Sequence, residues 1–231
     1  MKRIFLALLV SLPLVTFAAK APAPARAPDP SLAPIQDVDG LPRVLLIGDS
    51  ISMGYTIPVR ELLKGAANVH RPPTNCSSTS SGLKKLDDWL STGKWDVIHF
   101  NWGLHDLKYL DEKGKYVGPD QGKQVAPLPV YEKNLRELVA RLKKTGAKLI
   151  WCSTTPVPDG TLGRVKDSEI EYNRIAATVM KENGVVIDDL HALVSAHQAE
   201  YQLPKNVHFS KEGYQKLAEQ VVASIKTQLA K

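Results

Sequence analysis

RVLLIGDS, residues 43–50, joins a short aliphatic run to a glycine, an aspartate and a serine. The continuous apolar run over 43–47 is typical of a strand that is buried on both faces of a parallel sheet. Gly48 permits a tight turn after it, and apolar residues at helical spacing then continue until Gly65. A serine at such a strand-to-helix turn can expose its hydroxyl while its own N–H points toward a developing oxyanion. This segment therefore predicts a parallel α/β sheet with a reactive Ser50 at the end of its first strand.

The rest of the chain repeats this alternation of strand and helix. The order favours an α/β fold in which a central parallel sheet of about five strands is covered by helices on both faces. Residues 107–128 are polar and contain three glycines, which predicts an inserted loop. The further strands are expected near residues 67–70, 96–101, 148–152 and 185–187, and the further helices near 83–90, 130–144, 168–182 and 210–229.

Three segments of different composition divide the chain. Residues 1–19 have a positively charged start and continue as apolar and small residues, which predicts a secretory signal peptide. This stretch is short for a membrane span and is interrupted by Pro13, so we expect no stable membrane insertion. The Ala/Pro-rich residues 20–40 predict an extended linker, and residues 41–231 are enough for one well-buried domain. We therefore expect an exported protein, either periplasmic or secreted.

The composition disfavours several other classes of protein. The chain has 30 basic and 24 acidic residues, and its basic residues are scattered, which disfavours nucleic-acid binding. Two cysteines cannot complete a cysteine-only zinc site, and the histidines lack metal-ligand spacing, so we expect no metal and no cofactor. Cys76 and Cys152 could pair in an oxidising compartment, but the expected strand order separates them and favours two free thiols. The oligomeric state stays open.

Reactive side chains follow the strands at the edge where the active sites of parallel sheets lie. Ser50 follows the first strand, and NWGLHD, residues 101–106, follows the third. His208 comes just before the last helix, in NVHFS, residues 206–210. An early serine and a late histidine, with polar loops between them, indicate nucleophilic catalysis in which Ser50 attacks and His208 is the general base.

Three blocks of the sequence resemble the SGNH/GDSL hydrolase family over essentially the whole of residues 41–231. They match the family's first, third and fifth blocks and read Gly48-Asp49-Ser50, Gly103-Leu104-His105-Asp106 and Val207-His208-Phe209. The resemblance implies a flavodoxin-like three-layer α/β/α sandwich and metal-free ester hydrolysis by Ser50 and His208. It also implies an oxyanion hole made of the backbone N–H groups of Ser50 and Ser77 and the His105 side chain.

Three positions depart from the family pattern. Ser77 stands where the family has a glycine and His105 where it has an asparagine, although a backbone N–H and a neutral imidazole can still donate to an oxyanion. Lys205 stands where the family has the aspartate that orients the histidine, and a lysine cannot take over that task. His208 must then be held by a backbone carbonyl or by one of two carboxylates that follow the fifth strand, Asp188 and Asp189.

The candidate residues also have structural interpretations. Ser50 could cap the first helix, His208 could be a satisfied surface histidine, and His105 could position its loop through hydrogen bonds. The residues expected to support the site without reacting are Asp49, Gly103 and Asp106.

Two classes of function fit these observations. The first is an exported serine esterase that acts on small esters or acylated carbohydrates and releases acetyl or other short acyl groups. A lipase is disfavoured because the chain shows no long apolar lid segment. The second is a non-catalytic carbohydrate-binding module that keeps the hydrolase fold, and Lys205 is its main support.

Overall fold

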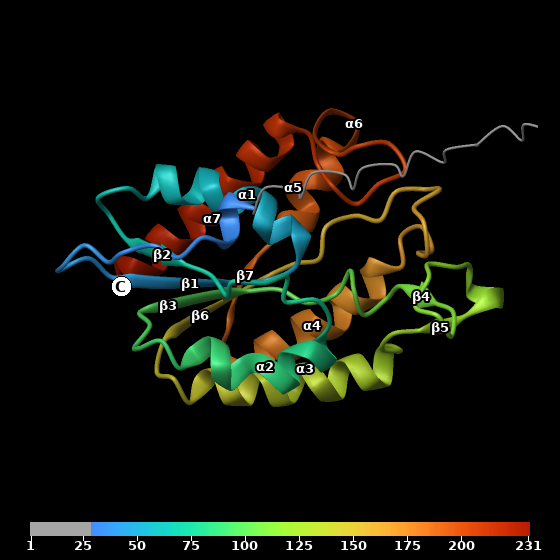
Figure 1. The fold of residues 1–231 in the computed structure, drawn as a ribbon, viewed down its shortest axis with the longest axis horizontal. Helices are drawn as coiled ribbons and strands as arrows, with labels where there is room; N and C mark the ends of the chain where they lie inside the picture. The colour runs from blue at the N-terminus through green and yellow to red at the C-terminus, as the bar shows by residue number, and fades with distance from the viewer. Residues whose placement is uncertain (1–28) are drawn as a thin grey trace, which may run out of the picture.

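The computed structural model describes residues 29–231, which form a three-layer α/β/α sandwich (Figure 1). Its central sheet has five parallel strands in the order β2-β1-β3-β6-β7. Since β4 and β5 form a separate hairpin, this is the doubly wound order 2-1-3-4-5 of flavodoxin-like folds, and the predicted fold is confirmed. The strands are β1 (Arg43–Ile47), β2 (Asn68–His70), β3 (Val97–Phe100), β6 (Lys148–Cys152) and β7 (Val186–Asp188).

Helices cover both faces of the sheet (Figure 1). One layer contains α1 and α7, which pack against each other, and the other contains α2, α3 and α4. The observed bounds of the five helices lie within about four residues of the expected bounds, and the first helix ends three residues before Gly65. Their bounds are α1 (Ser50–Leu62), α2 (Thr79–Leu90), α3 (Leu128–Lys143), α4 (Glu169–Asn183) and α7 (Lys211–Leu229).

The first strand is buried on both of its faces, which explains its unbroken aliphatic sequence. Residues 44–47 of β1 are each at most 2% exposed. Full burial of one aliphatic side chain stabilises a fold by about 1.5–3 kcal/mol. The turn that carries Ser50 is therefore fixed to the most deeply packed part of the sheet.

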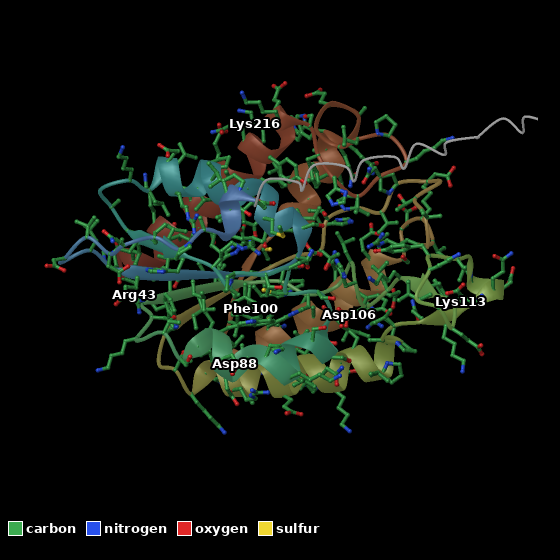
Figure 2. The ribbon with its side chains drawn as sticks, in the orientation of Figure 1. Arg43, Asp88, Phe100, Asp106, Lys113 and Lys216 are labelled. Atoms are coloured by element: carbon green, nitrogen blue, oxygen red, sulfur yellow. The ribbon has the colours of Figure 1, made fainter. Side chains whose placement is uncertain are left out.

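The polar segment after β3 contains a small hairpin where a loop was expected. β4 (Tyr109–Leu110) pairs antiparallel with β5 (Lys123–Gln124), and η2 (Pro119–Gln121) lies between them. Strands of two residues are too short to give an alternating sequence pattern. The hairpin extends beyond the carboxyl ends of the main strands, where Figure 2 marks it by Lys113.

Two short helices between β7 and α7 were also not predicted. They are α5 (Leu190–Ala196) and α6 (Gln198–Tyr201). With seven and four residues, neither is long enough for a clear helical period. They complete the layer of α1 and α7 and lead the chain back to the segment that carries His208.

The described chain begins inside the predicted linker. The predicted signal peptide, residues 1–19, and the first part of the linker lie outside the described residues. From there on the chain packs on the domain: η1 (Pro30–Leu32) contacts α1, and the Asn68 side chain makes two hydrogen bonds, of 2.9 and 3.0 Å, with the backbone of Val38. None of the helices in residues 29–231 is long and apolar enough to cross a membrane. Cys76 and Cys152 are buried free thiols, as predicted.

Candidate active site

Ser50 is the first residue of α1 and lies at the carboxyl end of β1. The residue before it caps the helix, since Asp49 Oδ1 accepts the Ile51 N–H at 2.9 Å. The Ser50 hydroxyl is therefore not used as a cap, and its Oγ lies 2.9 Å from His208 Nε2. As the first helical residue, Ser50 also has no intrahelical acceptor for its own N–H. Ser50 therefore offers two groups at this turn, a hydroxyl in contact with His208 and a backbone N–H without an acceptor in the helix.

The ring of His208 is held by the side chain of Asn206. The Asn206 Oδ1 accepts the His208 backbone N–H at 3.1 Å and lies 2.7 Å from ring Nδ1. A backbone N–H can only donate, so the atom that it contacts is the amide oxygen, and Nδ1 must donate to the same oxygen. In the neutral ring Nε2 then carries no proton and can accept the one from Ser50. The two contacts select the tautomer that a general base requires.

The structure corrects the expected partners of His208. Asp188 Oδ2 lies 3.0 Å from His99 Nε2 in the core, and Asp189 caps α5. Both carboxylates are engaged away from the pocket, so neither orients His208. The ring is held by a side-chain amide rather than by a backbone carbonyl or a carboxylate.

Asn206 was missed because the family pattern directs attention to position 205. Lys205 is exposed and has a left-handed backbone with a φ of 54°. The signal for Asn206 was nevertheless in the sequence. An asparagine often accepts the N–H of the residue two positions on, in an Asx turn, and Asn206 precedes His208 by two.

His105 lines the same pocket and is held as a neutral N–H donor. Its Nδ1 lies 3.2 Å from Lys108 Nζ and 3.1 Å from Ser77 Oγ. An ammonium group only donates, so Nδ1 accepts and the ring proton is on Nε2. Burial, supported by the charges of Lys108 and Arg164, lowers the pKa of His105 to about 4, although Asp49 acts to raise it. The tautomer and the protonation state are both those that an oxyanion donor needs.

Ser77 differs from its predicted role. Its φ of 55° lies in the left-handed region, where the family's glycine meets no steric resistance. The Ser77 N–H donates to Asn75 Oδ1 at 2.9 Å, in a second Asx turn. Because this N–H already has an acceptor, it is not free for an oxyanion, and Ser77 contacts the site through its hydroxyl on His105 instead. The available donors are the Ser50 N–H and His105 Nε2.

Asp106 and Gly103 hold the loop that carries His105. Asp106 accepts hydrogen bonds from the N–H and hydroxyl of Thr79, so it caps α2 from another part of the chain. Burial raises the pKa of the Asp106 carboxyl to about 7. In Figure 2, Asp106 lies between Phe100 of β3 and the hairpin. A Cβ at Gly103 would come within 2.1 Å of Thr154 Oγ1, so only glycine fits this close approach.

These groups open into a pocket of about 430 Å³. Its wall also includes Tyr116 from the hairpin segment and Leu162 and Arg164 from the loop after β6. No sequence pattern had pointed to Arg164. A second groove, of about 890 Å³, shares Asn75 with the pocket. Within residues 29–231, no group of three or more histidines, cysteines and carboxylates is placed to hold a metal ion.

Asn206→Asp is expected to raise kcat for ester hydrolysis and to move the acid limb of its pH profile to higher pH. His208 must be neutral to accept a proton, and burial lowers its pKa from 6.5 in the native protein. The wild-type limb therefore lies below pH 6.5. An aspartate can keep both hydrogen bonds and adds a negative charge that favours the imidazolium, which raises the pKa. The measurement is kcat/KM against pH for both proteins.

Two further variants give this prediction its control. Asn206→Ala removes the acceptor of both hydrogen bonds, so the misaligned ring should lower kcat by about 100-fold. Lys205→Asp places a carboxylate at the family position but leaves Asn206 on Nδ1, so its limb should move less than that of Asn206→Asp. An equal or larger shift with Lys205→Asp would show that position 205 controls the ring.

Comparisons with known proteins identify the family of this chain. The sequence model of the GDSL-like lipase/acylhydrolase family matches residues 46–216. Among curated proteins, no sequence matches the chain significantly. The solved lipase/acylhydrolase from Enterococcus faecalis is 20% identical, with a TM-score of 0.65 over 81% of this chain and 97% of that chain. An acetylxylan esterase from Geobacillus stearothermophilus is 18% identical, with a TM-score of 0.65 over 80% and 94% of the two chains.

A further acetyl xylan esterase is 17% identical, with a TM-score of 0.62 over 79% of this chain and 99% of that chain. At these identities the solved structures show a shared fold and no more. The family match shows more than a shared fold, because it covers most of the chain, including Ser50, His105 and His208. The resemblance found in the sequence is thereby confirmed, and the chain belongs to the GDSL-like lipase/acylhydrolase family and is a hydrolase of carboxylic esters.

Proposed function

We propose that this protein is an exported serine esterase that removes acetyl or other short acyl groups from carbohydrates. The observation that carries the proposal is the 2.9 Å contact between Ser50 Oγ and His208 Nε2, in a pocket that also contains His105. Export rests on the sequence of residues 1–19 alone.

The reaction follows from the tautomers of the two histidines. Ser50 Oγ attacks the ester carbonyl as His208 Nε2 takes the hydroxyl proton. The carbonyl oxygen becomes an oxyanion and accepts hydrogen bonds from the Ser50 N–H and His105 Nε2. The imidazolium then gives its proton to the departing alcohol, which leaves an acyl group on Ser50. Water, deprotonated by His208, attacks this acyl group, and the acid is released with the proton returned to Ser50.

Two features support a short acyl group on a larger alcohol. Ser50 lines a pocket of about 430 Å³, which lies toward the small end of the range for small-molecule sites and is consistent with a short acyl group. The groove of about 890 Å³ that shares Asn75 with this pocket offers space for further sugar units. Two of the similar structures are named as acetylxylan esterases, which is consistent with this substrate class.

The alternative of a non-catalytic carbohydrate-binding module loses its main support. It depended on Lys205, which cannot orient a catalytic histidine. Asn206 orients His208 instead, and a protein that only bound sugar would have no use for a histidine held as a proton acceptor toward a serine.

A comparison of esters tests the proposal. The purified protein should hydrolyse p-nitrophenyl acetate with a higher kcat/KM than the butyrate or octanoate ester, and should release acetic acid from acetylated xylo-oligosaccharides. Faster turnover of the octanoate would identify a long-chain lipase. Binding of the oligosaccharides without release of acid from any ester would favour the carbohydrate-binding module over the esterase.

A further inference from the structure

Arg164 is a half-buried arginine in the wall of the active-site pocket. Its Nε donates to the backbone oxygen of Leu104 at 2.9 Å, and its guanidinium lies 5.6 Å from the centre of the Tyr116 ring. No carboxylate in residues 29–231 forms an ion pair with it. Nε is engaged by Leu104, and the guanidinium also has a side-chain hydrogen bond with Tyr116. Its remaining N–H groups are those that can meet a ligand.

A second positive charge lines the same pocket as this arginine. It belongs to Lys205, which has an exposed side chain. The Lys108 ammonium is already engaged with His105 Nδ1 and does not belong to this set. We call Arg164 and Lys205 the basic rim. Asp49 is the one carboxylate among the described residues that line the pocket, and it is 3% exposed with Oδ1 on the Ile51 N–H. The positive charge at the mouth therefore has no counter-charge within reach of a ligand.

A cation that is partly removed from water without a partner is unfavourable. Burial lowers the pKa of Arg164 in agreement with this cost, although Tyr116 and the charge of Asp49 act to raise it. An anion from outside the chain would offset it, and the end of a guanidinium binds carboxylate, sulfate or phosphate through two parallel N–H bonds. The pocket that Ser50 lines thus contains the cationic groups of an anion-binding site.

We propose that the basic rim binds an anionic group on the alcohol side of the ester, so that the preferred substrates are acylated acidic carbohydrates such as an acetylated uronic acid. The alcohol side is chosen because a short acyl group has no position for a second charge. This inference rests on the proposed esterase function and names its substrate class. It makes Arg164 a determinant of specificity, whereas the chemical steps belong to Ser50 and His208.

The test compares substrates of equal size and different charge. A mono-acetylated methyl glucuronoside carries a carboxylate, and its glucuronamide counterpart is neutral. An acetylated methyl glucoside 6-sulfate tests the second kind of anion. For the wild-type protein we expect kcat/KM for the carboxylate to exceed that for the amide by about 10- to 100-fold, mainly through KM. The ratio should fall as NaCl is added, because salt screens exposed charges.

Three variants locate the effect. Arg164→Gln should reduce the carboxylate-to-amide ratio to about one, mainly through a higher KM for the carboxylate. Arg164→Lys keeps the charge without the two-point fork and should give an intermediate ratio; it replaces the Gln variant if that fails to fold. Lys166→Gln removes an equal charge from an exposed residue paired with Asp167, outside the pocket, and should leave the ratio unchanged.

The outcomes separate this inference from the proposed function. A wild-type ratio near one, with good hydrolysis of neutral esters, overturns the anion site and leaves the esterase. An equal loss for both sugars in Arg164→Gln assigns Arg164 a structural role through Leu104 and also overturns it. A higher kcat/KM for the sulfated sugar than for the uronic acid supports the anion site and identifies sulfate as its preferred group.

A binding measurement covers the case in which no ester is turned over. Calorimetry on Ser50→Ala with the same acetylated acid and amide should show tighter binding of the acid by about 10-fold or more. Equal binding of the two would reject the anion site whatever the catalytic result.

Discussion

Ser50→Ala should lower ester turnover by about 10⁴-fold or more, the size of effect seen when a serine nucleophile is removed. The loss should appear in kcat, and labelling by a fluorophosphonate should disappear with it. The fold should be unaffected, because Asp49 rather than Ser50 caps α1 and, within residues 29–231, the Ser50 hydroxyl hydrogen-bonds with His208 alone. Alanine is also a good helix former. The thermal midpoint should therefore stay close to that of the wild type.

Ser52→Ala is the matched control in the same helical turn. The Ser52 hydroxyl donates to the Asp49 backbone oxygen and accepts a hydrogen bond from Arg71 in the interior. Its loss should lower the free energy of unfolding by about 1–3 kcal/mol, yet labelling at Ser50 should persist. Labelling of Ser50→Ala at the wild-type rate would place the nucleophile elsewhere.

His105→Ala should lower kcat by about 100- to 1000-fold with a much smaller change in KM. The reason is that His105 Nε2 donates to charge that exists in the transition state and not in the bound ester. His105→Asn supplies the donor that is usual in the family and should retain more activity than Ala. The measurement is steady-state kinetics on one neutral ester with all three proteins.

The contacts of His105 allow a separate check on its role. Lys108→Met removes the donor to Nδ1 but leaves the ring in place. We expect a smaller loss than for His105→Ala, because Ser77 Oγ still lies 3.1 Å from Nδ1. Alanine and asparagine variants of equal activity would exclude His105 from the oxyanion hole and leave it as a residue that positions its loop.

The parts of the fold that were predicted well are those with continuous apolar runs. β1 and β6 have the predicted bounds because each is buried on both faces, and burial on both faces produces an uninterrupted pattern. The β4-β5 hairpin has partly exposed side chains and strands of two residues, so neither composition nor period revealed it. Element length and burial, more than residue type, decided what the sequence could show.

The sequence predicted that Ser50 and His208 would lie together, and the structure places them 2.9 Å apart, whereas the residues that orient them were not predicted. Ser50 and His208 come from separate ends of the chain, and the family blocks placed both in one pocket. The direction of the Ser77 N–H depends on the side chain of Asn75, and the choice of Asn206 over Lys205 depends on a local turn. Arg164 reaches the pocket from an irregular loop without periodicity. Such details are set by side-chain geometry at single positions, which a pattern of residue types does not contain.

The neutral side chain at position 206 links two opposing demands on the site. An aspartate there would stabilise the imidazolium of His208, but it would also stand in the same pocket wall as Arg164 and Lys205. Its negative charge would compete with an incoming anion for those cations. The Asn206 amide aligns the ring without this competition. It stabilises the His208 imidazolium less than a carboxylate would, but it leaves Arg164 and Lys205 available to attract an acidic substrate. In Asn206→Asp the two effects should separate, with kcat rising for neutral esters and KM rising for anionic ones.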